Sequence, residues 1–599
     1  MHGGVISHPD DGPATFTRRD CSAALGLTLF ASLLRLLFLL GSPDRAWPHS
    51  TLYEGDAPTW ARWADALHRG QPFEFDLPVR TPGVAHLLSW LSVHGPGPSF
   101  MAWKVGWCLI ASLGCGLFYL ACRETIGRRC ALIAASLWAC SYGGLVLATS
   151  LNNETPYGTL IMAIVWLTLW AARRPAWWLI GALGVLHGAA MLLRAEHLLL
   201  LVLLEAWVWW RGRSGSLPRP DKTTRRAAIR WLHLLPLRAA TVGVIALLAC
   251  MPWIIAGSNA IQRFNDRPAQ PVRYELLRPR WTTEAAAFME SLPAFAREGN
   301  ALYLTHLARQ RGQSEITRSD VETFFEREFG FIPRRLARYH LVSLKGPLDF
   351  ALANDPDGDG GFSKQLLIGP LTPEGNLTFG HPDHNRLVTQ GYSVGWGWIQ
   401  ESPGAWLGLV VRKLTVFADG AAPGVAAYNL PLGRDGIRRA VDAATPRHGP
   451  AWWVWSVLTA GMLGGGVLIA AKRRCGGAWA VVILSKIIVT IAFYGYARQA
   501  MSIQPAFLFF MALAIERAWS AAGSRRPGWL TCRTVPAILL GGAILAGVTD
   551  AWRGRAYDVR PLDPRHAITP TPHWGVGAFE SPDGLELQTI ARRRSAAGE

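Results

Sequence analysis

Residues 100–121 read FMAWKVGWCLIASLGCGLFYLA and carry one charged residue, Lys104, in 22 positions. The hydrocarbon core of a bilayer, about 30 Å thick, takes about 20 apolar residues of α-helix. The segment Phe100–Ala121 is therefore predicted to span a membrane. Ten further stretches have the same apolar character: Cys21–Leu40, Ala131–Thr149, Tyr157–Ala172, Trp177–Leu193, His197–Trp210, Leu235–Gly257, Trp452–Ala471, Trp479–Tyr496, Ala500–Ile515 and Val535–Trp552. Together these segments predict an all-α polytopic membrane protein with about 11 transmembrane helices.

Composition and charge agree with this fold class. Of the 599 residues, 50% are hydrophobic and 17% are charged, whereas soluble domains average about 25% charged residues. The net charge is +18, and most short basic loops fall on one side of the predicted membrane. Because basic loops stay in the cytoplasm, the excess charge indicates topology and gives no reason to expect a nucleic-acid partner. We expect a protein of the cytoplasmic (inner) membrane with a cytoplasmic N-terminus.

Two long segments are predicted on the extracytoplasmic side. Residues 1–257 form a transmembrane module whose first outer loop is 41–99, and 258–451 form an outer loop domain. Helices are expected over Thr282–Arg309 and over Ser319–Asp349, the second broken at Gly330 and Pro333. The segment 406–417 is too short to span and is predicted to lie on the outer leaflet. Residues 452–552 supply the last transmembrane helices, and 553–599 form an extracytoplasmic tail.

The first outer loop carries acids close to the end of a span. Glu54 and Asp56 precede an amphipathic stretch that ends at Gly70, and Arg80 follows ten residues later. A carboxylate at headgroup level could act as a base or bind a cation near a lipid-borne substrate. Exposed loop acids are more often simply solvated, so the pattern alone leaves both interpretations open.

Three more ionisable residues fall on the same predicted outer side. Glu154 precedes Pro156 at the start of a helix, where it could serve only as a capping carboxylate. Arg194 lies between two spans and could simply pair with Glu196. Arg498 lies in the loop after Tyr494 and could snorkel towards headgroups or clamp a phosphate. Taken together, two acids and two arginines on one face suit catalysis on a phosphate-linked lipid.

These motifs resemble those of the C-type (GT-C) membrane glycosyltransferases, which use polyprenyl-phosphate sugars and include protein O-mannosyltransferases and bacterial aminoarabinose and lipopolysaccharide-core sugar transferases. The resemblance covers about residues 25–210 and, more faintly, 490–518. Glu54-Gly55-Asp56 is similar to the family's acidic first-loop motif, and Leu151–Tyr157 to its second acidic position. Met191–Glu196 resembles the membrane arginine motif, and Tyr494–Pro505 the late arginine motif, with Gln499 where tyrosine is common.

The resemblance implies a GT-C fold and a glycosyltransferase activity on the extracytoplasmic face. Asp56 takes the role of the catalytic base and Glu154 joins it in the site, while Glu54, Arg80, Arg194 and Arg498 are the expected substrate-binding residues. A carboxylate base would activate the acceptor, arginine would stabilise the departing phosphate, and the anomeric carbon would invert. The expected partners are a polyprenyl-phosphate sugar donor, membrane lipid, and a glycan, lipid or protein acceptor.

No cofactor is required by this chemistry, and a divalent cation stays an open alternative. Asp355, Asp357 and Asp359 have the spacing of the first half of a calcium loop, but position twelve of that loop is Leu366. His381 and His384 flank Pro382, which argues against a helix, so we expect a solvated loop there.

Two other classes of function remain open. A lipid-linked glycan polymerase, ligase or oligosaccharyltransferase would share the topology, and would extend or join glycans. A lipid or glycan transporter would place ionisable residues at mid-membrane in broken helices, whereas these residues gather at one face.

Overall fold

The computed structural model describes residues 17–40, 57–70, 77–94, 100–149, 151–173, 176–213, 225–268, 271–356, 358, 360, 377, 379–421, 450–473 and 475–523. The predicted span Val535–Trp552, the tail 553–599 and the site candidates Glu54, Asp56, Asp357 and Asp359 lie outside these residues.

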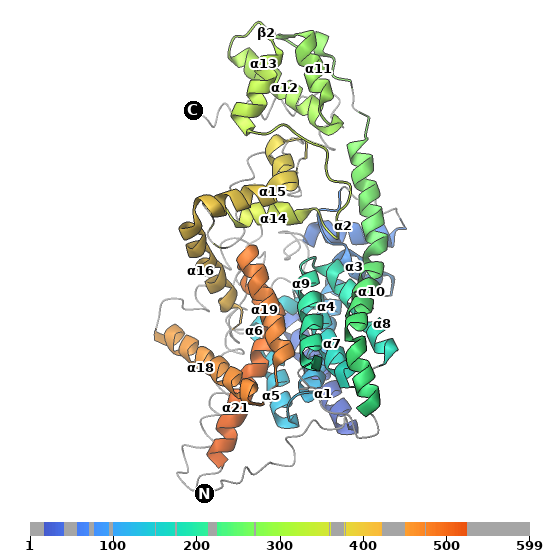
Figure 1. Cartoon of the computed structure of the whole chain (residues 1–599), viewed down its shortest axis with the longest axis vertical. Helices are drawn as coiled ribbons and strands as arrows, with labels where there is room; N and C mark the ends of the chain where they lie inside the picture. The colour runs from blue at the N-terminus through green and yellow to red at the C-terminus, as the bar shows by residue number, and fades with distance from the viewer. Residues whose placement is uncertain are drawn as a thin grey trace.

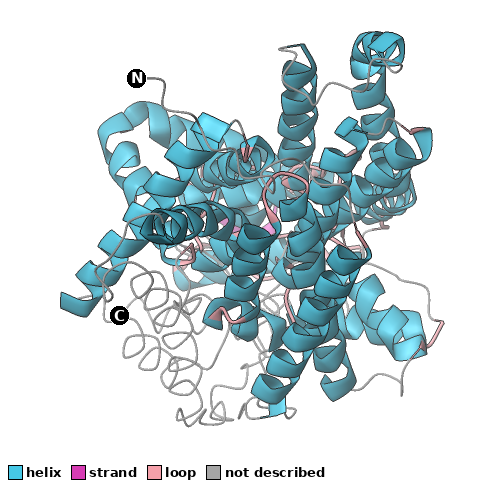
Figure 2. Cartoon of the chain, turned by 90° about the horizontal axis from the view of Figure 1, so that it is seen from below, coloured by secondary structure: helices cyan, strands magenta, loops and turns pink. Residues whose placement is uncertain are grey.

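The described part of the chain is almost entirely helical (Figures 1 and 2), which confirms the predicted fold class. The elements of the first half are α1 (Arg18–Leu40), α2 (Ala57–His68), α3 (Gly83–Val93), α4 (Phe100–Arg123), α5 (Arg128–Ala139), α6 (Tyr142–Thr149), α7 (Glu154–Arg173), α8 (Trp177–Leu193), α9 (His197–Arg213) and α10 (Arg225–Asn265). Those of the second half are η4 (Tyr274–Leu276), β1 (Arg280–Trp281), α11 (Thr283–Ser291), α12 (Ala294–Gln310), β2 (Glu315–Ile316), α13 (Arg318–Thr323), the π-helix η5 (Phe324–Phe329), α14 (Lys345–Ala353), α15 (Pro382–Glu401), α16 (Pro403–Asp419), α18 (Pro450–Arg473), α19 (Gly477–Ala492), α20 (Ala497–Ser502) and α21 (Gln504–Gly523).

By length and composition, four helices of the described residues can cross a membrane: α1, α4, α7 and the part of α10 from Pro236. A fifth crossing results if α5 and α6, which meet at 62°, count as one bent span, while α3, α8 and α19 are apolar but shorter. The number of eleven spans stays a prediction.

The bend interrupts the predicted span Ala131–Thr149. The Oγ of Ser141 accepts a hydrogen bond from the backbone N–H of Gly144 at 3.5 Å, as a residue at a helix start does. Ser141 also pairs with Gln504. A hydroxyl that bonds to the backbone in this way favours a new helix start over continuation.

The apolar helices pack into one bundle with a shared core. Helix α4 lies against α1 and α7, α8 lies against α10, and α21 lies against α5 and α18. The longest helix, α10, has 41 residues and extends beyond the bundle to the outer helices α11–α13, as Figure 1 shows. Small residues allow these close contacts: a Cβ on Gly188 would come within 2.8 Å of the carbonyl oxygen of Ala246.

Two helices of the outer domain, α11 and α13, begin within one residue of the predicted starts, whereas residues 330–344, inside the predicted stretch Ser319–Asp349, are not helical. The Thr282 side chain accepts a hydrogen bond from the N–H of Ala285 and caps α11, and Leu292-Pro293 separates α11 from α12. Helix α13 starts with a capping box between Thr317 and Asp320. The short parallel pair of β1 and β2 joins these helices around their own apolar core.

The prediction of a solvated loop around His381 and His384 is wrong. Pro382 is the first residue of α15, where a missing N–H costs nothing. Both histidine side chains are fully buried, and the His381 ring packs edge-on against Phe329. The helix predicted over 406–417 is present as α16.

Candidate functional site

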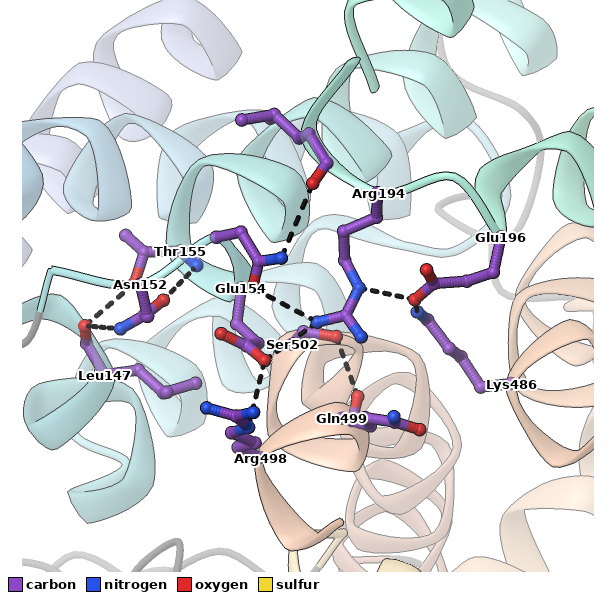
Figure 3. A network of polar contacts seen from close by, with 12 residues as sticks. Leu147, Asn152, Glu154, Thr155, Arg194, Glu196, Lys486, Arg498, Gln499 and Ser502 are labelled. Carbon is purple, nitrogen blue, oxygen red and sulfur yellow. Dashed lines mark hydrogen bonds and ion pairs between the residues drawn. The ribbon is translucent and has the colours of Figure 1, made fainter. Parts of the chain in front are cut away.

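Five charged side chains from four segments come together near the start of α7 and the end of α8 (Figure 3). Arg194 lies between two carboxylates: its Nη1 is 2.8 Å from Oε1 of Glu154, and its Nε donates to Oε1 of Glu196. Lys486 Nζ lies 3.0 Å from the same Glu196 oxygen, and Arg498 Nε lies 3.3 Å from Glu154 Oε1. We call these five residues the charged cluster.

Glu154 is placed by the start of α7. Asn152 caps this helix, because its Oδ1 accepts a hydrogen bond of 2.8 Å from the N–H of Thr155. The carboxylate of Glu154 is therefore not the cap and turns towards the two arginines instead. Its side chain is 1% exposed, so the guanidinium groups replace the water that it has lost.

Arg194 and Glu196 come from the tight connection between α8 and α9. Burial by itself lowers the pKa of the Arg194 guanidinium, but Glu196 and Glu154 outweigh burial and raise this pKa above its ordinary value. Burial likewise opposes ionisation of Glu196, and the charges of Arg194 and Lys486 nevertheless hold the pKa of Glu196 well below its usual range. Both side chains are therefore charged at neutral pH.

Lys486 is the member of the cluster that the sequence analysis missed. It lies inside the apolar helix α19 and is 2% exposed. Its Nζ lies 4.5 Å from the centre of the Tyr157 ring, which adds a cation–π contact. The available signal was a lysine within a predicted span, since an ionisable residue in such a position marks a functional candidate.

Arg498 is the most accessible cation of the cluster. Its side chain is 28% exposed, while the side chains of Arg194 and Lys486 are 10% and 2% exposed. The guanidinium also lies 5.0 Å from the centre of the Tyr496 ring. Arg498 therefore faces Glu154 and does not extend away from the protein, as a purely snorkelling arginine would.

The segment that carries Arg80 lies beside the cluster. The Oγ1 of Thr81 donates a hydrogen bond of 2.8 Å to the carbonyl of Leu193, the residue before Arg194. Gly83 packs so closely on the end of α8 that an added Cβ would come within 2.7 Å of the Leu192 carbonyl oxygen. The structure thus brings Glu154, Arg194 and Arg498 together, and it places Thr81, the residue after Arg80, against the segment that carries Arg194. Asp56 precedes α2 directly in the sequence.

The calcium candidate is only partly described. Asp355 is buried, and the other two acids of the motif lie outside the described residues. Among the residues that the structure describes, no group of three or more His, Cys, Asp or Glu side chains could hold a metal ion. The calcium loop stays a prediction.

The charged cluster suits the binding of a phosphate. Within the described residues, three cations face two carboxylates, which leaves one positive charge in excess. Glu154 and Glu196 hold Arg194 from two sides, so its position is preorganised. Arg498, which faces Glu154 and is 28% exposed, is the arginine of the cluster that can offer donors to phosphate oxygens.

Residues 81–223 match the family model described as dolichyl-phosphate-mannose-protein mannosyltransferase. The match includes Glu154 and Arg194 and leaves Asp56, Lys486 and Arg498 outside. It confirms the relation to the C-type glycosyltransferases that the sequence motifs predict. No curated protein matches the chain.

Solved structures of two other membrane proteins are similar to this chain. The oligosaccharyltransferase AglB from Archaeoglobus fulgidus, in complex with an inhibitory peptide and a dolichol-phosphate, has a TM-score of 0.48 at 14% identity over 96% of this chain. This chain spans 59% of the length of that protein. ArnT from Cupriavidus metallidurans, bound to undecaprenyl phosphate, has a TM-score of 0.32 at 12% identity and covers 87% of each chain. Likeness at this level does not bear on function.

Proposed function

We propose that this chain, whose residues 81–223 match a C-type glycosyltransferase family model, is a membrane glycosyltransferase that takes a sugar from a polyprenyl-phosphate donor. The acceptor is a glycan, a lipid or a protein on the extracytoplasmic face of the cytoplasmic membrane. In this proposal residues 1–257 form the catalytic membrane module, 258–451 the outer domain, and 452–552 the last transmembrane helices.

The observation that carries the proposal is the excess positive charge of the charged cluster. Arg194 is neutralised by Glu154 and Glu196, and Lys486 shares Glu196. Arg498 shares Glu154 and keeps 28% of its side chain exposed. A lipid phosphate that approaches Arg498 would neutralise the remaining charge. The same contact would stabilise the phosphate as it leaves the sugar, because its negative charge grows during that step.

Asp56 is proposed as the general base, on the resemblance of Glu54-Gly55-Asp56 to the family's first-loop motif. It would remove the proton of the acceptor hydroxyl while that oxygen attacks the anomeric carbon. The bond from this carbon to the phosphate oxygen would break, the phosphate would keep the electron pair, and the sugar would invert. Glu154 is the less suitable base, because Oε1 of its carboxylate is already shared by two arginines.

The test is sugar transfer by membranes of a deletion strain that carries the full-length wild type or a variant. We expect Asp56→Asn to abolish transfer with normal expression. Asp65→Asn is the matched control, because Asp65 lies on helix α2 and pairs with the exposed Arg69 of the next turn. Near-normal transfer by Asp56→Asn would show that Asp56 is not the base.

Mass spectrometry of the glycans in the same strains distinguishes the remaining alternatives. A single added sugar supports the proposal, and a ladder of lengths indicates a polymerase or ligase. Unchanged glycans together with a lipid-linked sugar retained on the cytoplasmic side would indicate a transporter.

A further inference from the structure

Lys413 is a buried lysine that lies away from the charged cluster. It comes from α16, has a fully buried side chain, and donates hydrogen bonds from Nζ to Oδ1 of Asn354 at 3.0 Å and to the carbonyl of Ile491 at 3.1 Å. Asn354 in turn donates to the carbonyl of Ala492 at 2.9 Å. These bonds tie α16 and the end of α14 to the last turn of α19.

Two glycines pack on the backbone of α16 at the same point. A Cβ on Gly495 would lie 2.0 Å from the carbonyl oxygen of Lys413, and one on Gly360 would lie 3.0 Å from its backbone nitrogen. The N–H of Gly495 donates a hydrogen bond of 2.8 Å to the carbonyl of Gly360. No larger residue fits at Gly495 unless α16 or the loop moves. We call Lys413, Asn354, Gly360 and Gly495 the Lys413 junction.

Gly495 of the Lys413 junction lies three residues before Arg498 in the sequence. The connection from α19 to α20 is only four residues long, 493–496, so a displacement of Gly495 reaches Arg498 over a very short segment. Helix α16 also packs directly against both α19 and α20. Helix α16 therefore contacts the helices on both sides of the short connection that precedes Arg498.

The N-terminal end of α16 connects to the outer domain. It follows α15 directly at Pro403, and α15 packs along α14, which ends at Ala353, one residue before Asn354. Its opposite face exposes Leu407 and Val411, which are 58% and 63% exposed. One helix thus joins the outer domain to the loop that carries the arginine.

We infer that Lys413, Asn354 and Gly495 are positioning residues that hold Arg498 at the donor phosphate, so that the outer domain and the donor site act together. This inference rests on the proposed function. It predicts that a change at the junction weakens phosphate binding through Arg498 and by no other route.

The experiment measures binding of undecaprenyl phosphate to the purified full-length protein in detergent. Gly495→Ala adds only the methyl group that collides with α16, and we expect it to weaken binding about tenfold, as the loss of a charge-assisted hydrogen bond would. The matched control is Gly408→Ala, on α16 itself, where an added Cβ meets nothing within 4 Å. We expect this variant to bind as the wild type does.

Arg498→Ala separates this inference from the proposed function. We expect Arg498→Ala to weaken binding, and Gly495→Ala to add no further loss in the Arg498→Ala background. If Arg498→Ala binds as tightly as wild type, the proposed phosphate site is wrong. If Arg498→Ala weakens binding but Gly495→Ala does not, the inference fails and the proposed function stands. Equal losses from Gly495→Ala with and without Arg498 would also overturn the inference.

A second variant applies if Gly495→Ala does not fold. Lys413→Met removes the two hydrogen bonds of Nζ and keeps most of the volume of the side chain. We expect Lys413→Met to weaken undecaprenyl phosphate binding in the presence of Arg498 and to add no further loss in the Arg498→Ala background. The control is Lys472→Met, because Lys472 is exposed at the end of α18. Binding by Lys413→Met that equals the wild type would contradict the inference.

Discussion

Removal of Lys486 tests whether the charged cluster is a single electrostatic unit. Its Nζ lies 3.0 Å from Oε1 of Glu196, and at this separation two unit charges attract by about 5 kcal/mol at an effective dielectric constant of about 20. Much of this attraction offsets the loss of hydration, because Lys486 is 2% exposed. In Lys486→Met, Glu196 keeps Arg194 as a partner. The expected net loss in unfolding free energy is therefore about 2 to 3 kcal/mol, below the usual range for a carboxylate that loses its only buried partner.

The same change has a specific effect on binding. Without Lys486, Glu196 attracts Arg194 more strongly and draws it away from Glu154, and the excess positive charge is lost. We expect undecaprenyl phosphate to bind about tenfold more weakly. The second substitution Glu196→Gln removes the carboxylate that has lost its lysine partner and restores the excess charge, so the double variant is expected to recover most of the lost affinity.

The assay is a double-mutant cycle on the full-length protein in detergent, with thermal unfolding and phosphate binding measured for each variant. Lys472→Met serves as the control, because Lys472 is exposed at the end of α18. A coupling energy of about 1 to 3 kcal/mol between the two positions is expected for residues in contact. Strictly additive effects of the two substitutions would refute the electrostatic reasoning.

Three further changes test the structure away from the cluster. Burial lowers the pKa of Lys413 to about 7, whereas the pKa of a lysine side chain in an unfolded chain is about 10.4. Between these pH values the lysine is protonated only in the unfolded chain. The unfolding free energy of the wild type relative to Lys413→Met should therefore rise with pH from about 7 to 10. Thermal unfolding of both proteins in detergent at several pH values measures this difference, and a difference that does not change with pH would contradict the prediction. Asp20→Asn removes the carboxylate that is 2.9 Å from Arg123 and should lower the unfolding free energy by about 3 kcal/mol. Thermal unfolding measures this loss, and an unchanged midpoint would show that the pair does not stabilise the fold. Thr282→Ala removes the cap of α11 and should lower the stability of this helix by about 1 kcal/mol. The outer domain should then be cleaved faster by a protease, and cleavage at the wild-type rate would show that the cap does not stabilise the helix.

The helices could be predicted because hydropathy is a local property. The predicted segment Trp177–Leu193 agrees with α8 at both ends, and the start predicted at Thr282 lies within one residue of the start of α11. Topology predicted that Glu154, Arg194 and Arg498 share one face, because successive spans alternate direction. The structure brings these three side chains into contact.

Contacts between distant segments could not be predicted from one sequence. Lys486 and Glu196 lie 290 positions apart, and only the packing of α19 beside α9 brings them together. The burial of His381 and His384 depends in the same way on the residues that cover them. The apolar helices, their order and the few charges near their ends could be predicted from the amino-acid sequence, because they follow from the solvation of neighbouring residues. Which of these charges pair depends on tertiary packing, because pairing energy depends on the distance between side chains and on the water that packing excludes.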